Sequence, residues 1–141
     1  MLDLKSDLTI FSDGGSRGNP GPAACAYAIF QDGKLIKQDA KYLGITTNNT
    51  AEYSAVILAL EWVVKNSLGA GIIFNLDSEL VVRQLTGVYK IKNKDIVEFV
   101  LKIKNLQRIN NLEINWVHVP REKNKLADKL VNEKLDESSR L

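Results

Sequence analysis

Apolar and polar positions in the first 45 residues follow the pattern of antiparallel strands. The run LTIFSD, residues 8–13, is rich in β-branched and aromatic side chains. The segment 23–44 holds two apolar runs on either side of Asp32-Gly33. An Asp-Gly pair between two such runs is a strong hairpin signal. The pattern therefore predicts three antiparallel strands.

The spacing of apolar residues changes to that of a helix over residues 48–66. The apolar positions recur three and four residues apart, at Tyr53, Val56, Ile57, Leu60, Val63 and Val64. Asn48, Asn49 and Thr50 are candidate N-caps, and the stretch LGAG at 68–71 ends the helix. Because apolar side chains lie almost all round this helix, we expect it to be buried on more than one side.

Strands and helices alternate through the rest of the chain. The predicted order is strand 71–77, helix 78–87, helix 94–107, strand 112–119 and helix 121–135. The run 71–77 is typical of a strand covered on both faces. An antiparallel meander continued by crossover units gives a mixed sheet with helices on its faces. We expect a single domain over 1–141, with residues 1–7 and 136–141 as loose tails.

Composition narrows the class of protein. Of the 141 residues, 45% are hydrophobic, which is enough for one domain with a real core. The single cysteine, Cys25, excludes an internal disulfide and a zinc cluster. No run reaches the roughly 18 apolar residues that a membrane helix needs, and the start MLDLKSDL lacks the pattern of a signal peptide. We therefore expect a soluble, cytoplasmic monomer with no membrane partner.

Four acidic residues stand at the ends or on the faces of the predicted elements. Asp13 and Asp77 end two strands, Glu52 lies in the first turn of the long helix, and Asp128 lies in the middle of the last helix. Ligands gather at the carboxyl ends of strands in open α/β sheets, so Asp13 and Asp77 meet if their strands are neighbours. Clustered carboxylates repel one another unless cations lie between them, and oxygen ligands suit Mg²⁺ or Mn²⁺. Two such ions, about 4 Å apart, are a common device for in-line displacement at phosphorus.

Each acid also has an ordinary structural interpretation. Asp77 can cap the following helix, and Asp13 can be a turn residue. Glu52 can favour the positive end of its helix dipole, and Asp128 can be a solvated helix acid. The net charge of +2 says little about a polyanionic partner, but with these four acids neutralised by metal, 19 basic residues would face 13 acidic ones, a net +6. Such a surface suits nucleic acid.

Four stretches, DGGSRGNPGPAACAYAI, TNNTAEYSAVILAL, DSELVVRQLTG and HVPREKNKLADKLVN, together resemble ribonuclease H of type 1 over residues 8–135. The resemblance implies a ribonuclease H-like α/β fold: a five-stranded mixed sheet, with three antiparallel strands followed by parallel crossover strands and helices on both faces. It implies an endoribonuclease that hydrolyses the RNA strand of RNA–DNA hybrids and leaves 5′-phosphate and 3′-hydroxyl ends.

The same resemblance implies two Mg²⁺ ions, replaceable by Mn²⁺. By resemblance, Asp13 bridges both ions and Asp128 helps to hold the ion that activates the attacking water. Glu52 and Asp77 hold the ion that stabilises the leaving 3′ oxygen. His118 lies six residues before Asn124, the spacing of a catalytic histidine in many members, and is expected to have an accessory role. The alternative is a plain edge-strand histidine.

Contacts to the hybrid are also implied by the resemblance. Small residues in the glycine-rich run let the backbone approach ribose, whose 2′-hydroxyl distinguishes RNA from DNA. Thr47 and Asn49 resemble the side of the site that holds DNA phosphate, and Asn48 a base or ribose contact, although the same residues can cap the helix. The full set of candidates is Gly14, Ser16, Gly18, Asn19, Thr47, Asn48, Asn49, Arg121 and Asn124.

The chain departs from some members of the family at the connection between the two middle helices. Only TGVYKIKNKD, residues 86–95, joins them, where those members carry a basic protrusion that contains tryptophan. Lys90, Lys92 and Lys94 either contact phosphate or form a solvated turn.

Three other functions stay open. The chain could be a non-catalytic module that binds hybrids, but binding alone does not require all four acids. It could be an exonuclease or strand-transfer relative with the same metal geometry, but the ribose-contact motifs favour RNA cleavage. It could also be a ribonuclease H domain excised from a reverse transcriptase.

Overall fold

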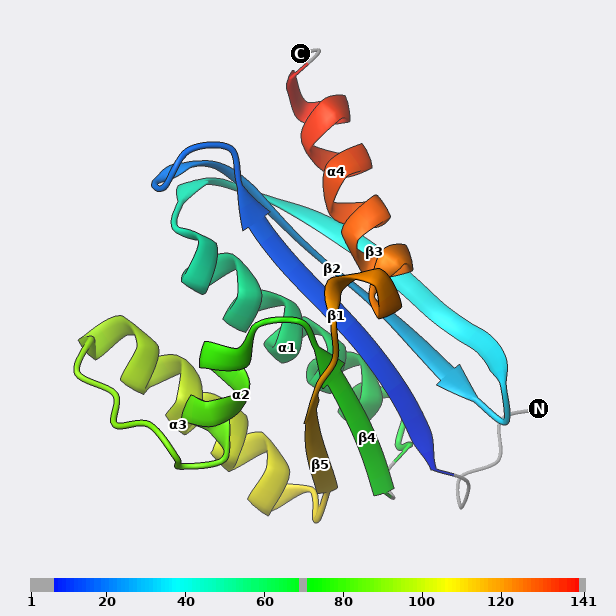
Figure 1. Ribbon diagram of the computed structural model, residues 1–141. Helices are drawn as coiled ribbons and strands as arrows, with labels where there is room; N and C mark the ends of the chain where they lie inside the picture. The colour runs from blue at the N-terminus through cyan, green and yellow to red at the C-terminus, as the bar shows by residue number, and fades with distance from the viewer. Residues whose placement is uncertain (1–6, 69–70, 140–141) are drawn as a thin grey trace.

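The computed structural model describes residues 7–68 and 71–139, and its centre is a five-stranded sheet with the order β3-β2-β1-β4-β5 (Figure 1). The strands are β1 (Leu8–Ser16), β2 (Gly21–Gln31), β3 (Lys34–Thr46), β4 (Gly71–Leu76) and β5 (Glu113–His118). The helices are α1 (Asn48–Lys65), α2 (Glu79–Leu85), α3 (Lys94–Ile109) and α4 (Lys125–Ser139), with a short 3-10 turn at Arg121–Lys123. The predicted mixed sheet and the predicted order of elements are confirmed.

The strand pairing brings two of the predicted site strands together. Strands β1, β2 and β3 are antiparallel, as the hairpin signal predicts, while β4 pairs in parallel with both β1 and β5. The parallel pairing of β1 with β4 ends at Ser12 and Leu76, but the antiparallel pairing with β2 continues to Ser16. The prediction that Asp13 ends its strand is therefore wrong, because β2 carries β1 three residues further. Asp13 instead lies where the parallel part of the ladder stops.

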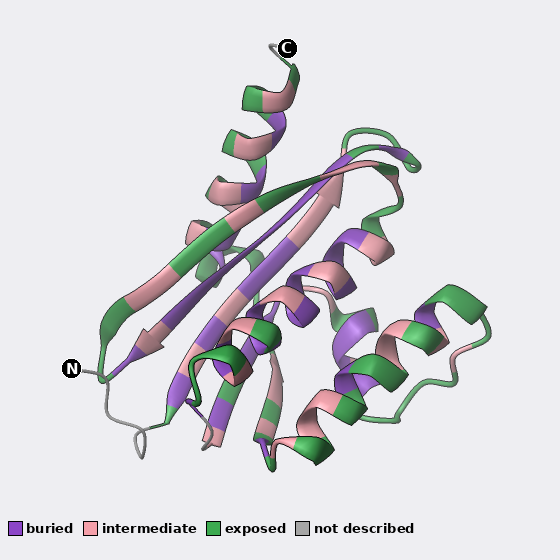
Figure 2. Cartoon of the chain, turned by 180° about the vertical axis from the view of Figure 1, so that it is seen from behind, coloured by how far each residue is buried: buried purple, intermediate pink, exposed green. Residues whose placement is uncertain are grey.

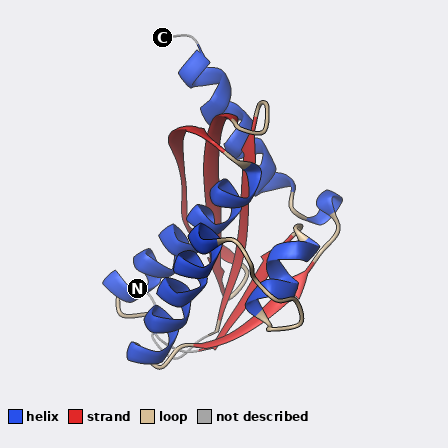
Figure 3. Ribbon diagram, turned by 90° about the vertical axis from the view of Figure 1, so that its left-hand side faces the viewer, coloured by secondary structure: helices blue, strands red, loops and turns tan. Residues whose placement is uncertain are grey.

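Helices cover the two faces of the sheet unequally. Helix α1 crosses one face, and α4 lies on the other (Figures 1 and 2). Figure 3 shows α1 and α3 side by side, so α1 is enclosed between the sheet and a second helix. This arrangement confirms the expected burial of α1 on more than one side. No helix in the described ranges combines the length and the apolar character needed to cross a bilayer.

The face that carries α4 is only partly covered. Val131 and Leu135 of α4 pack on Ala24 and Ala26 of β2. Helix α4 contacts β1, β2 and β3, and Ile73 of β4 is 41% exposed. The prediction that residues 71–77 are covered on both faces is therefore wrong for this position.

Several helix boundaries differ from the prediction. The N-cap of α1 is Thr47, whose Oγ1 accepts a hydrogen bond from the Thr50 backbone N–H at 3.2 Å. Glu52 therefore lies in the second turn rather than the first. Helix α4 begins only after the 3-10 turn, so Asp128 lies in its first turn and not in the middle.

The predicted tails fall partly outside the described residues. Asp136–Ser139 continue α4, so the prediction of a loose tail is wrong there. Residues 1–6 and 140–141, and with them the rest of that prediction, lie outside the described ranges, as do residues 69–70 of the predicted helix stop.

Gly14 determines how closely α1 approaches the sheet. A Cβ atom at this position would collide with the backbone of Ala51 and Glu52. Only glycine therefore allows the start of α1 to lie against β1 at this depth. The neighbouring Gly15 has room for a side chain, because the nearest atom to a Cβ at that position would be Val131 Cγ1, at 3.9 Å.

We expect Gly14→Ala to lower the free energy of unfolding by about 1–3 kcal/mol, the usual range for overpacking. Gly15→Ala is the matched control and should change stability little. Urea unfolding of the two variants beside the wild type measures the difference. Equal stability of the two variants would contradict a close contact at Gly14.

Candidate active site

Three carboxylates from three different elements meet at the end of the parallel ladder. Asp13 comes from β1, Glu52 from α1, and Asp77 directly follows β4. One carboxylate oxygen from each lies within 4.8 Å of the other two. Asp13 is 7% exposed, Glu52 is 8% exposed, and Asp77 is half-buried. The neighbouring strands thus bring Asp13 and Asp77 together as predicted, and the Gly14 contact brings Glu52 to them.

Burial and mutual repulsion disfavour the charged forms of these acids. Burial, and then the charge of Asp77, raises the pKa of Asp13 to about 7. Burial, followed by the charges of Asp13 and Asp77, raises the pKa of Glu52 well above its usual range. A hydrogen bond joins the Asp13 and Glu52 side chains, and it lowers the pKa of Asp13 while it raises the pKa of Glu52. Three negative charges this close together are disfavoured unless a cation lies among them.

Two oxygens of the cluster are left without a partner. Glu52 Oε2 and Asp77 Oδ2 are buried and accept no hydrogen bond in the described part of the protein. A buried acceptor without a donor is costly, and a bound cation would satisfy both oxygens at once. Because the three ligands are all carboxylates, the donor set fits a hard divalent cation rather than zinc.

Asp77 is not the cap of α2. Ser78 occupies that position, and its Oγ accepts a hydrogen bond from the Val81 backbone N–H at 3.3 Å. The interpretation of Asp77 as only a helix cap is therefore wrong. Its carboxylate is left to face Asp13 and Glu52.

The fourth predicted acid, Asp128, lies in the same cleft but outside the group of three. A cleft of 390 Å³ is lined by all four acids, among other residues. The charge of Asp128 contributes to the raised pKa of Asp13. Helix α4 lies on the opposite face of the sheet to α1, so Asp128 joins the lining of the cleft from that side.

Asn124 connects the strand that carries Asp13 to the helix that carries Asp128. Its side chain is 1% exposed, and Nδ2 donates to the Ser12 carbonyl at 2.8 Å. Its own carbonyl accepts from the Asp128 backbone N–H at 3.1 Å. This burial argues against the predicted phosphate contact by Asn124, whereas Arg121 lines the cleft.

The two halves of the predicted hybrid contact are joined by hydrogen bonds. The backbone N–H and Oγ of Ser16 donate to Asn48 Oδ1 at 2.8 and 3.0 Å, and the Asn48 N–H donates to Asn19 Oδ1 at 3.0 Å. The cleft is lined by Gly14, Ser16, Asn48 and Asn49. Thr47 is occupied as the cap of α1, and Gly18 lies at the exposed tip of the turn between β1 and β2. Their contacts with a hybrid stay predictions.

His118 is the last residue of β5, the edge strand. Its Nδ1 lies 3.9 Å from Glu79 Oε2, and its side chain is 43% exposed. The strand assignment agrees with the edge-strand interpretation, and a role in proton transfer stays a prediction.

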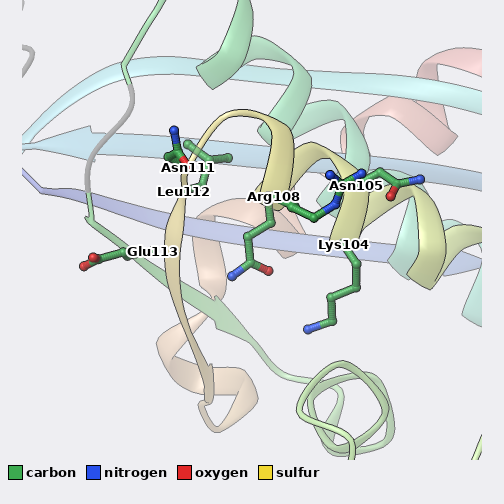
Figure 4. A pocket seen from close by; sticks show the side chains of 7 residues that line it. Lys104, Asn105, Arg108, Asn111, Leu112 and Glu113 are labelled. Carbon is green, nitrogen blue, oxygen red and sulfur yellow. The ribbon is translucent and has the colours of Figure 1, made fainter.

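A second and larger hollow, of 620 Å³, lies between the end of α3 and the start of β5 (Figure 4). None of the four acids lines it. Lys104, one of its basic residues, donates from Nζ to the Leu85 carbonyl at 2.8 Å. This bond satisfies a carbonyl group at the C-terminus of α2. This hollow is therefore separate from the carboxylate site.

Six residues that line the cleft are not among the predicted site residues: Gly15, Arg17, Ser78, Val131, Asn132 and Leu135. Arg17 forms an ion pair with Asp136, with Nη2 and Oδ1 2.7 Å apart, and Asn132 contacts Asp128. Asn132 could have been found, because it lies one helical turn after Asp128. The Arg17 contact joins residues far apart in the chain, so no local pattern indicates it.

Comparison with known proteins places the chain among related sequences. Residues 11–134 match the family described as Reverse transcriptase-like. Ribonuclease HI of Halobacterium salinarum is 37% identical over 131 residues, which cover 91% of this chain and 64% of that protein. Bifunctional protein Rv2228c of Mycobacterium tuberculosis is 34% identical over 131 residues, covering 92% of this chain and 35% of that protein. The chain thus spans between about a third and two thirds of the length of these curated relatives.

A solved structure is similar over nearly the whole chain. LC11-RNase H1 in complex with an RNA/DNA hybrid has a TM-score of 0.89 and 41% sequence identity, covering 93% of this chain and 98% of that one.

The raised pKa of Asp13 makes stability depend on pH when no metal is bound. Between its ordinary value of 3.8 and about 7, the folded protein holds a proton that the unfolded chain has lost. The proton on Asp13 therefore stabilises the folded protein. This stabilisation is greatest near pH 4 and is lost as the pH rises toward 7. We expect it to be on the order of a few kcal/mol.

Melting curves in chelator between pH 4 and 8 measure this dependence. Wild type should lose stability relative to Asp13→Asn as the pH rises, whereas Asp39→Asn, at an exposed position on β3, should follow the wild type. Parallel curves for all three proteins would show that Asp13 has no unusual titration.

Proposed function

The chain belongs to the type 1 ribonuclease H family, and from this membership we propose that it is an endoribonuclease that hydrolyses the RNA strand of RNA–DNA hybrids. One observation carries the proposal: the carboxylates of Asp13, Glu52 and Asp77, the first two of them buried, meet beside a loop suited to approach ribose. The reaction needs both parts, because the carboxylates serve the phosphate and the loop selects the sugar.

The residues present fit two divalent cations, and we propose Mg²⁺ with Mn²⁺ as a substitute. Asp13, Glu52, Asp77 and Asp128 would hold them. When bound, such ions supply an activated water and stabilise the charge that develops at phosphorus and on the leaving oxygen. The products would carry 5′-phosphate and 3′-hydroxyl ends.

The protein's own part is to hold oxygen ligands in place before substrate arrives. Asp13 lies on β1 and Asp77 directly follows the neighbouring strand β4, and a rigid sheet places a ligand more accurately than a loop does. Asn124 fixes the first turn of α4 against β1 through its 2.8 Å bond to the Ser12 carbonyl. The walls of the cleft therefore keep their spacing without help from the substrate.

Recognition of RNA is assigned to the loop between β1 and β2 and to the start of α1. Ser16, Asn19 and Asn48 hydrogen-bond to one another, so the loop and the helix form one continuous surface. Backbone groups beside Gly14 and Gly18 would approach the 2′-hydroxyl of the RNA strand. We further propose that the protein acts as a cytoplasmic monomer.

We expect Mg²⁺-dependent cleavage of the RNA in a labelled RNA–DNA duplex, with RNA–RNA and DNA–DNA duplexes as comparison substrates. Asp77→Asn should lower the cleavage rate by orders of magnitude, because it removes one metal ligand.

In chelator the Asp77→Asn variant should melt at or above the wild-type temperature. Ser78 still caps α2, and loss of one repelling charge is worth about 1–2 kcal/mol.

Cleavage that persists in excess chelator, or products with 2′,3′-cyclic phosphate ends, would refute the two-metal proposal. An Asp77→Asn protein that cuts hybrids normally would show that the proposed site is wrong.

Lys90 and Lys92 lie exposed in the connection from α2 to α3, and Lys94 begins α3. If they contact phosphate, changing all three to Ala should weaken hybrid binding and flatten its salt dependence. Each lost contact should reduce the slope of log K against log salt by roughly 0.9.

The matched control changes Lys34, Lys37 and Lys41 of β3, at the opposite edge of the sheet, to Ala. It removes the same charge and should leave the slope near the wild-type value. A slope that neither variant changes, or that both change equally, would mean that Lys90, Lys92 and Lys94 make no specific contact.

A further inference from the structure

One face of α4 carries three polar residues spaced four apart, and two of them line the cleft. Asp128, Asn132 and Asp136 follow one another along this face, as residues at i, i+4 and i+8 do on any helix. Asp128 and Asn132 both line the carboxylate cleft. The strip therefore leads from the fourth carboxylate along the wall of the site.

The Asn132 amide contacts Asp128 at two atoms. Its Nδ2 lies 3.0 Å from the Asp128 carbonyl and 3.4 Å from the carboxylate Oδ1. Within the described ranges no ion pair includes Asp128, and no other side chain donates to its carboxylate. Since the amide approaches Oδ1, the second oxygen, Oδ2, is left for another partner.

Asn132 itself is held on a fixed surface. Val131 and Leu135, on either side of it in the helix, pack on Ala24 and Ala26 of β2. The carbonyl of Asn132 accepts a hydrogen bond from Arg17 Nη2 at 3.5 Å, and the same nitrogen lies 2.7 Å from Asp136 Oδ1. The loop that carries the hybrid contacts is thus attached to this part of α4.

We propose that Asn132 is a positioning residue that orients the Asp128 carboxylate toward the metal site. The inference rests on the proposed function, in which Asp128 is the fourth metal ligand. Carboxylates that bind metals are usually held by such an outer hydrogen bond, and loss of one typically costs 10- to 100-fold in metal affinity or activity. Without the amide, Asp128 would lose rotamer freedom only when the ion binds, and the affinity would fall accordingly.

The test compares Asn132→Ala with Asn132→Gln and with Asn105→Ala. The Gln variant keeps the amide donor, and the Asn105 variant makes the same change at an exposed position of α3, away from the cleft. Two quantities are measured: the Mg²⁺ concentration that gives half-maximal cleavage of the hybrid, and the rise in melting temperature that Mn²⁺ causes.

For Asn132→Ala we expect the half-saturating Mg²⁺ concentration to rise about tenfold and the Mn²⁺-induced rise in melting temperature to shrink. In chelator its melting temperature should match or exceed that of the wild type, because Ala favours a helix more than Asn does. Asn132→Gln should recover part of the metal response, and Asn105→Ala should show the full response.

A metal response of Asn132→Ala equal to that of Asn105→Ala would overturn the proposal. So would a lower melting temperature in chelator with an unchanged response to both metals, which is the outcome for a purely structural residue. If the wild type does not cleave hybrids, the proposed function fails. The Mn²⁺ melting comparison still decides the role of Asn132 in that case.

Discussion

Repulsion between like charges at the end of the parallel ladder is the constraint around which this protein is built. Asp13 and Glu52 are almost fully buried, and Asp77 lies within 4.8 Å of both. Carboxylates in such a group would separate if the backbone were free to move. The fold prevents this because each acid belongs to a different rigid element, packed against the others through the core. A cation bound among the three carboxylates would remove this repulsion and so stabilise the folded protein.

The packing that resists this repulsion is short-range and specific. Gly14 lets α1 lie directly on β1, so Glu52 reaches the strand ends from the second turn of its helix. On the other side, the Asn124 side chain donates to the Ser12 carbonyl and so fixes the start of α4 against β1. Contacts on both faces of the sheet thus fix the site. On one face α1 packs closely on Gly14, and on the other the buried amide of Asn124 bonds to β1.

Much of this could be predicted from the sequence because the signals are local. The Asp32-Gly33 hairpin and the change of apolar period at residue 48 are both patterns of neighbouring residues, and the structure confirms the elements they predict. The boundaries were less predictable. Thr47 instead of Asn48 caps α1, and pairing with β2 carries β1 past Asp13. Contacts such as Arg17 with Asp136 depend on the tertiary arrangement, which no pattern along the chain contains.

The hydrogen bond that joins Asp13 and Glu52 affects how a cation would bind at this site. With both pKa values raised, the cluster without a cation keeps protons at pH values where free carboxylates would have released them. Carboxylates must give up their protons when they bind a cation, so cation binding and proton release are coupled. Binding of a cation at this site would therefore release these protons to the solvent. Acidification and metal scarcity would then act on this protein in the same direction, each favouring the protonated, resting form.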